Sequence, residues 1–151
     1  MKPITHLMIA GSRYSTRRAL DYARRVVQRA HQLGYTIIVG DNPKGVDMAV
    51  VQECRRLKAK MLVVGITNFP CNGSYSQGSY IKVDRDTYRA AGGYLLDSYQ
   101  TRDRWMVDNA TLGMFIWNGN SQGTKTGCAY MQSRHKEAHI ITFEFKGVYH
   151  G

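Results

Sequence analysis

Short apolar runs alternate with amphipathic stretches along this chain, and no other feature constrains the fold as much. Apolar runs of strand length lie at 4–10, 35–39, 60–66, 112–117 and 139–143. Between the first two of these runs, apolar residues recur at helical spacing, at Leu20, Ala23, Val27 and Ala30. Strands that alternate with helices indicate βαβ units. We therefore predict a three-layer α/β domain, with a doubly wound, mostly parallel sheet of about five strands.

The remaining elements complete one domain over residues 1–151. Gly34 is expected to end the first helix, since glycine tolerates the positive φ of a helix C-terminus. Further helices are predicted over 46–57, 84–91, 99–110 and 124–136. The alternation fails at 67–99, a segment rich in Gly, Ser, Asn and Tyr. We interpret it as an insertion whose tyrosines either close over a ligand or pack against the sheet edge or a partner subunit.

The charge balance favours anionic partners. Lys and Arg number 21 against 11 Asp and Glu, which gives a net charge of +10 and a pI near 9.7. Nucleotides, nucleic acid and phosphorylated metabolites are the expected classes. The first predicted helix contributes a possible basic face for single-stranded nucleic acid through Arg17, Arg18, Arg24, Arg25 and Arg29.

Cysteine and histidine usage points to a cytoplasmic protein without a metal. Cys54, Cys71 and Cys128 fall in no CxxC spacing, so free thiols in a reducing compartment are expected. The sequence has no secretory leader pattern and no apolar run long enough to cross a membrane. The five histidines form no HExxH motif. We expect neither a metal nor a bound cofactor.

Glycine-containing loops follow three predicted strands, where an open parallel sheet binds its ligands. They begin at Gly11, Gly40 and Gly119. Glycines let backbone N–H groups approach a phosphate, and the helix that follows adds its positive end. If the first and fourth predicted strands are neighbours, two of these loops face each other across one crevice. The predicted phosphate-binding residues are Gly11, Ser12, Arg13, Gly40, Lys44, Gly45, Asp47, Arg102, Gly119, Ser121, Gly123 and Thr124.

The loop at Gly119-x-Ser121-x-Gly123 also matches the nucleophile elbow of an α/β hydrolase. That motif needs an acid and then a histidine downstream, at separate strand ends. Glu137 and His139 lie too close together in sequence to fill those positions. The phosphate-loop interpretation is therefore preferred.

Four motifs together resemble the SLOG superfamily. They are Ile9-Ala10-Gly11-Ser12-Arg13, Gly40-Asp41 with Gly45-Val46-Asp47, Arg102-Asp103-Arg104-Trp105-Met106-Val107, and Trp117-Asn118-Gly119-Asn120-Ser121-Gln122-Gly123-Thr124. Their order and spacing most resemble those of the motifs in the small bacterial and phage branch related to YspA. The superfamily also includes the LOG-type phosphoribohydrolases and the DNA-processing protein DprA. The resemblance implies a Rossmann-like fold that holds a nucleotide-derived ligand, in a homodimer or higher homo-oligomer.

One departure from LOG-type enzymes bears on catalysis. Their Gly-Gly-x-Gly-Thr-x-x-Glu stretch supplies a catalytic glutamate, and Gly127 stands at that position here. Arg102 lies where the resemblance places the catalytic arginine, and Asp103 or Asp108 could replace the missing carboxylate. The leading hypothesis is therefore a nucleotide-ligand-binding protein that senses or sequesters its ligand. An N-glycosidase acting on a nucleoside monophosphate or an ADP-ribose-like compound is the alternative, and single-stranded nucleic-acid binding is the third.

Overall fold

The computed structural model describes residues 3–73, 79–84 and 98–146, which form a parallel sheet between two layers of helices. The strands are β1 (His6–Gly11), β2 (Thr36–Gly40), β3 (Met61–Gly65), β4 (Ser79–Lys82), β5 (Leu112–Trp117) and β6 (Glu137–Thr142). The helices are α1 (Arg17–Gln32), α2 (Gly45–Leu57), α3 (Ser98–Asn109) and α4 (Gln122–Ser133). Among these residues, no helix is both long and apolar enough to cross a membrane.

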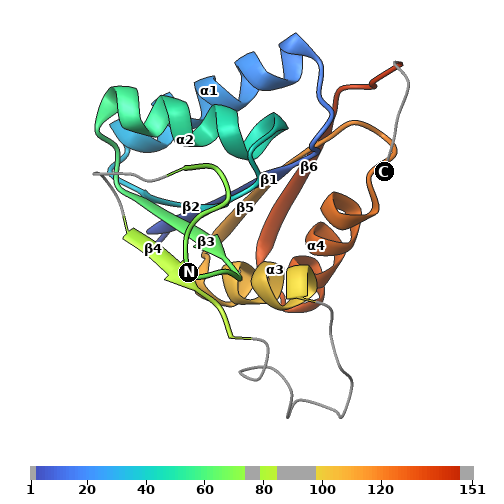
Figure 1. Cartoon of the computed structure of the whole chain (residues 1–151). Coiled ribbons are helices and arrows are strands. Elements are labelled where there is room, and N and C mark those ends of the chain that lie inside the picture. Colours follow the sequence, from blue (N-terminus) through green and yellow to red (C-terminus); the bar gives the residue numbers. More distant parts are fainter. Residues whose placement is uncertain (1–2, 74–78, 85–97, 147–151) are drawn as a thin grey trace.

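The strand order confirms the doubly wound prediction. The six strands are parallel and lie in the order β4-β3-β2-β1-β5-β6. The chain builds outward from β1 to β4, then returns to place β5 on the other side of β1 (Figure 1). Gly11 at the end of β1 pairs with Ile116 near the end of β5. The sheet therefore has its switch point between these two strands, where a ligand crevice is expected.

The sheet has six strands, and the expectation of about five missed β4. This strand falls inside 67–99, where the sequence predicts loop. It has four residues, it pairs only with β3 at the sheet edge, and Ser79 and Lys82 at its ends are exposed. A strand this short and half-buried has too little apolar alternation to be recognised. The Tyr80 hydroxyl donates to the Thr67 carbonyl at 2.7 Å, so this tyrosine braces the edge of the sheet.

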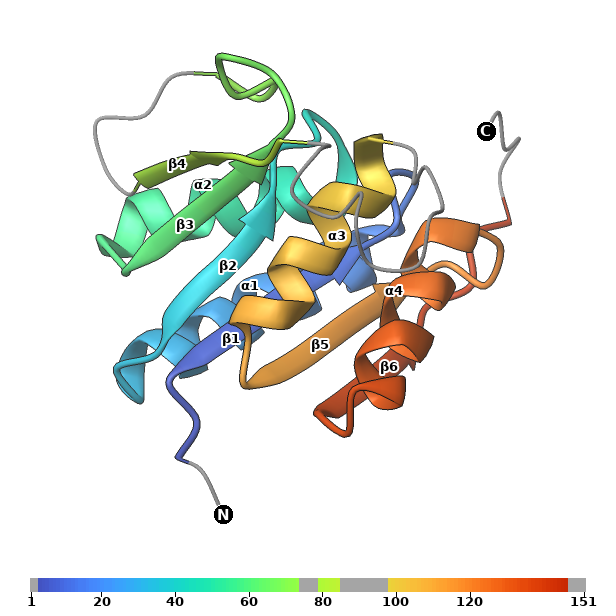
Figure 2. The ribbon, with the colours of Figure 1, turned by 90° about the horizontal axis from the view of Figure 1, so that it is seen from below.

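The strand residues alternate between two apolar cores, one on each face of the sheet. Leu7 and Ile9 of β1 pack with α1 and α2, while Met8 between them packs with α3 and α4. Figures 1 and 2 show α1 and α2 on one face, and α3 and α4 on the other. The period of two along a parallel strand thus produces the predicted three layers.

Helix limits follow the local signals in the sequence. Thr16 caps α1, its hydroxyl accepting from the Ala19 N–H at 3.1 Å, and Gly34 follows the helix at φ +77°. Gly34 therefore has the predicted role. The helix predicted over 84–91 lies outside the described residues beyond Asp84, as do most of the tyrosines of 67–99.

Three elements meet at the end of β1. The Ser12 N–H donates to the Ile116 carbonyl of β5 at 3.1 Å, and the Val46 N–H of α2 donates to the Ser12 carbonyl at 3.3 Å. A Cβ on Gly11 would overlap the Val46 side chain and lie 2.7 Å from the Ile116 carbonyl oxygen. Glycine at position 11 therefore allows the strand end and α2 to touch.

The contact between Gly11 and α2 can be tested by substitution. Gly11→Ala should lower the free energy of unfolding by about 1–3 kcal/mol, because the added methyl group forces α2 or β5 to shift. Gly123→Ala is the matched control, since a Cβ there meets no atom within 4 Å. It should leave stability unchanged or raise it by up to about 1 kcal/mol, the usual gain of alanine over glycine in a helix. Urea unfolding measures both variants, and equal stabilities would contradict the assignment.

Candidate functional site

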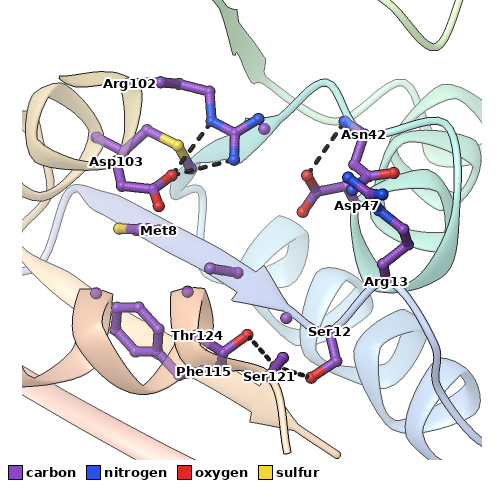
Figure 3. Close-up of a pocket in the computed structure, with 16 residues that line it drawn as sticks. Met8, Ser12, Arg13, Asn42, Asp47, Arg102, Asp103, Phe115, Ser121 and Thr124 are labelled. Carbon is purple, nitrogen blue, oxygen red and sulfur yellow. Dashed lines mark hydrogen bonds and ion pairs between the residues drawn. The ribbon is translucent and has the colours of Figure 1, made fainter. Parts of the chain in front are cut away.

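A cavity of about 170 Å³ opens at the carboxyl ends of β1 and β5. Its lining comes from both strands, from the loop after β2, and from α2, α3 and α4 (Figure 3). This is the predicted switch-point crevice. Its floor is apolar, formed by Met8, Ala10, Met106 and Phe115. Met8, Met106 and Phe115 are each no more than 1% exposed, so the floor is part of the core beneath α3 and α4.

One wall of the cavity consists of hydroxyl groups from two loops far apart in sequence. Ser12 Oγ and Ser121 Oγ lie 2.6 Å apart, and Ser121 Oγ donates to Thr124 Oγ1 at 3.2 Å (Figure 3). Ser12 Oγ also accepts from the Asn118 N–H at 2.9 Å. The loops after β1 and β5 are therefore joined to each other by hydrogen bonds.

The first turn of α4 begins at this wall. Ser121 is its N-cap residue, but its hydroxyl makes no capping bond within the described structure and points to Ser12 instead. Asn118 Oδ1 accepts from the N–H groups of Asn120 and Ser121, which holds the turn before the helix. The first N–H groups of a helix have no intrahelical acceptor and form its positive end. A Cβ on Gly123 would meet nothing within 4 Å, so this residue presents its backbone to the cavity.

The opposite wall carries a guanidinium surrounded by carboxylates. Arg102 of α3 contacts Asp103 through Nη2 at 3.1 Å and Asp41 through Nη1 at 3.4 Å, and its side chain is 13% exposed. Asp47 of α2 accepts from the Asn42 N–H at 3.3 Å. A Cβ on Gly40 would lie 2.6 Å from Asp47 Oδ2 and 3.2 Å from Arg102 Cζ. Glycine at position 40 thus leaves the space that these two side chains occupy.

Charge and burial shift the pKa values on this wall. Burial raises the pKa of Asp47 to about 6, although the Arg102 charge and the Asn42 N–H act to lower it. Burial also acts to lower the pKa of Arg102, but the charges of Asp103, Asp47 and Asp41 outweigh it and raise that pKa. Asp47 can therefore take up or release a proton near neutrality, whereas Arg102 stays charged.

The structure brings most of the predicted phosphate-binding residues into one cavity. Gly11, Ser12, Arg13, Gly40, Asp47, Arg102, Ser121, Gly123 and Thr124 line it. Three others are outside its lining as far as the structure describes it. The Lys44 ammonium lies 6.0 Å from the centre of the Tyr14 ring, and Gly45, at φ +69°, packs against the Ser12 carbonyl. Gly119, at φ +90°, shapes the turn before α4.

Other lining residues were not among the predicted phosphate-binding residues. The apolar floor is one such group, because its residues are typical of any core. Asn42 and Gly127 also line the cavity. Of the two carboxylates considered as replacements for a catalytic glutamate, Asp103 lines the cavity. Asp108 instead accepts from the Tyr130 hydroxyl at 3.1 Å.

The basic helix lies away from this cavity. α1 covers the face of the sheet opposite to α3 and α4 (Figure 2). Arg24 pairs with Asp21 at 2.9 Å, and Arg18 and Arg25 lie over the rings of Phe143 and Tyr22. The arginines of α1 and the candidate cavity are therefore separate features.

Comparisons with known proteins identify the fold. No family model matches the sequence, and neither does any curated protein. Among solved structures, the molybdenum cofactor binding protein from Rippkaea orientalis aligns with a TM-score of 0.70 at 11% identity, over 95% of this chain and 80% of that one. The Moco carrier protein from Chlamydomonas reinhardtii aligns with a TM-score of 0.67 at 12% identity, over 93% and 78%.

A third similar structure is a DNA processing protein A. The protein from Helicobacter pylori, described with a single-stranded DNA binding mode, aligns with a TM-score of 0.60 at 16% identity, over 90% of this chain and 64% of its own. DprA belongs to the superfamily that the sequence motifs resemble. The resemblance is thus confirmed at the level of the Rossmann-like fold, and the similar structures are of proteins that bind a cofactor or DNA.

The raised pKa of Asp47 predicts a pH dependence of stability. The native state binds this proton more tightly than the unfolded state, so the free energy of unfolding should fall as pH rises from about 4 to about 6. The shift from 3.8 to about 6 corresponds to about 3 kcal/mol. Asp47→Asn keeps an acceptor for the Asn42 N–H but does not titrate, so it should become more stable than the wild type above pH 6. Urea unfolding between pH 4 and 8 gives the comparison, and parallel curves for the two proteins would contradict it.

Proposed function

We propose that this protein binds a nucleotide or a nucleotide-derived phosphorylated ligand at the switch-point cavity. The proposal is carried by the convergence of two predicted loops on one wall of the cavity. Ser12, from the loop after β1, meets Ser121 and Thr124 from the loop after β5, at the open first turn of α4. Backbone N–H groups at a helix start and nearby hydroxyls are the groups that bind phosphate in parallel α/β folds.

Arg13 supplies the accessible positive charge of this surface. It follows Ser12, is exposed, and lines the cavity, whereas Arg102 is largely buried between Asp41 and Asp103. A guanidinium already matched by carboxylates has less charge to offer an anion. Arg13 is therefore the arginine proposed to contact the phosphate, and Arg102 the one that fixes the acidic wall.

The similar structures support ligand binding in general. A molybdenum cofactor and single-stranded DNA are named for them, so this fold accommodates different ligands at low sequence identity. The ligand of this chain is sought by offering it a mixture of nucleoside monophosphates, NAD, ADP-ribose and molybdenum cofactor. Mass spectrometry of the fraction retained with the protein identifies the class that binds.

Two substitutions test the phosphate site. Arg13→Ala removes the accessible cation. Gly123→Val adds a branched side chain to the cavity lining at the first turn of α4, at a position where the Cβ itself would meet no atom within 4 Å. Each substitution should lower the affinity for the retained ligand by at least about 10-fold, the expected effect of losing a charged hydrogen bond. Arg17→Ala, an exposed arginine of α1, is the charge-matched control. Calorimetric titration gives the affinities, thermal unfolding should stay cooperative in all three, and full affinity in both site variants would refute the assignment.

A second candidate function is hydrolysis of the base–ribose bond of such a ligand. Asp47, with a pKa near 6, and Asp103 both line the cavity on either side of Arg102 in Figure 3. Glycoside hydrolysis uses such a pair of carboxyl groups. The protonated carboxyl would give its proton to the departing base as the base–ribose bond breaks. The ionised carboxylate would orient the water that adds to the ribose carbon and accept the proton that this water loses. Gly127 leaves no carboxylate at the position that LOG-type enzymes use, so this pair would replace it.

Release of free base during incubation with a nucleotide distinguishes the hydrolase from the binding protein. Chromatography after incubation with AMP would detect adenine together with ribose 5-phosphate. If the protein is a hydrolase, Asp47→Asn should slow adenine release by about 100-fold or more, the usual contribution of a general acid, while AMP affinity changes little. Absence of free base with every bound nucleotide would exclude hydrolysis and leave the binding function.

A further inference from the structure

A groove between α3 and α4 adjoins the switch-point cavity, and we propose that it receives the planar heterocycle of the ligand. This inference rests on the proposed function, in which the phosphate occupies the cavity. The groove encloses about 310 Å³ and shares Asp103, Gly123 and Gly127 with the cavity. Sites for small ligands usually enclose about 300–1,000 Å³, and the cavity alone, at about 170 Å³, is smaller. A ligand larger than a sugar phosphate would therefore extend beyond the cavity, and the groove is the neighbouring space that shares its lining.

Gly127 lies at the junction of the two spaces. It is buried in α4 and lines both of them. A Cβ at this position would lie 3.1 Å from Cε1 of Phe115, which is in the floor of the cavity. A larger side chain would crowd the Phe115 ring and take up space where the linings of the cavity and the groove meet. Glycine at position 127, in place of the glutamate of LOG-type enzymes, thus keeps a path between cavity and groove.

The groove wall carries a stacked arginine–tyrosine pair, which a planar ring can join from the side of the groove. The Arg104 guanidinium of α3 lies 4.7 Å from the centre of the Tyr130 ring of α4, and both residues line the groove. The Tyr130 hydroxyl donates to Asp108 Oδ1 at 3.1 Å, which fixes the position of the ring. Nucleobases stack on aromatic rings and on guanidinium groups. An aliphatic group of the same size would gain neither interaction.

Polar side chains on the exposed side of α4 favour a heterocycle over a plain aromatic ring. Gln122 and Thr126 line the groove and are exposed. A side-chain amide presents both a donor and an acceptor, and a hydroxyl can act as either. A ring with both donors and acceptors on its edge, such as a nucleobase, matches these groups.

A matched pair of tryptophan variants tests the groove. Thr126→Trp places a large ring in the groove, whereas Ala129→Trp places the same ring on the exposed surface of α4, outside the lining of both described pockets. AMP and ribose 5-phosphate are the two probes, because only AMP carries the heterocycle. Thr126→Trp should lower the affinity for AMP by about 5- to 150-fold, the range for loss of one base–aromatic stack. It should leave the affinity for ribose 5-phosphate unchanged. Ala129→Trp should leave both affinities unchanged.

A second pair tests stacking without filling the groove. Tyr130→Phe keeps the ring, while Tyr130→Leu removes it and keeps an apolar side chain in its place. AMP affinity should be retained in Tyr130→Phe and fall in Tyr130→Leu, with ribose 5-phosphate binding equally to both and circular dichroism confirming that both fold.

The results separate the two claims. Selective loss of AMP in Thr126→Trp and Tyr130→Leu supports the groove. The groove would be overturned if all four variants bound AMP with equal affinity. The phosphate site would still stand if these variants bound ribose 5-phosphate and Gly123→Val did not. Failure of the wild type to bind AMP, ribose 5-phosphate and the other nucleotides of the mixture would overturn the proposed function and the groove together.

Discussion

The end of β1 is fastened to the end of β5 by Ser12, and the candidate site depends on this attachment. The Ser12 N–H donates to the Ile116 carbonyl. The Ser12 hydroxyl accepts from the Asn118 N–H and lies within hydrogen-bond distance of Ser121 Oγ. The helices that follow the two strands, α1 and α4, cover opposite faces of the sheet, so without these bonds the loops after β1 and β5 would be free to separate. With them, the hydroxyls of two distant loops and the first turn of α4 form one surface, which is the surface proposed to bind phosphate.

The opposite wall is held together by charge. The Arg102 guanidinium contacts Asp41 and Asp103. Asp47 is buried nearby, and the Arg102 charge offsets only part of the effect of burial, so the pKa of Asp47 is raised. Gly40 makes this arrangement possible, because a Cβ there would collide with the Asp47 carboxylate. The cavity thus has one wall suited to anions and one that can exchange a proton near neutral pH. A binding protein needs the first, whereas a hydrolase would need both.

Strong local periodicity made much of the fold predictable. The strand over Leu112–Trp117 was located at both ends. The sequence left open whether this strand lies beside the first one, and the structure shows that it does, as β5 next to β1. β4 was missed because a four-residue edge strand carries little apolar alternation. At the site, Ser12, Ser121 and Thr124 could be found because glycine-containing loops mark strand ends. Phe115 and Met8 could not, since core residues look alike until the topology shows which of them face a cavity. The expected homo-oligomer stays a prediction.

The most direct measurement is an amide NMR titration of the wild type with AMP. If phosphate binds at the switch-point cavity, the largest shifts should fall on the N–H groups of Gln122, Gly123 and Thr124, with smaller ones around Ser12. These are the first N–H groups of α4 and the residue bonded to its N-cap. Shifts confined to the arginines of α1, on the other face of the sheet, would contradict the account and indicate an electrostatic surface unrelated to the switch-point cavity.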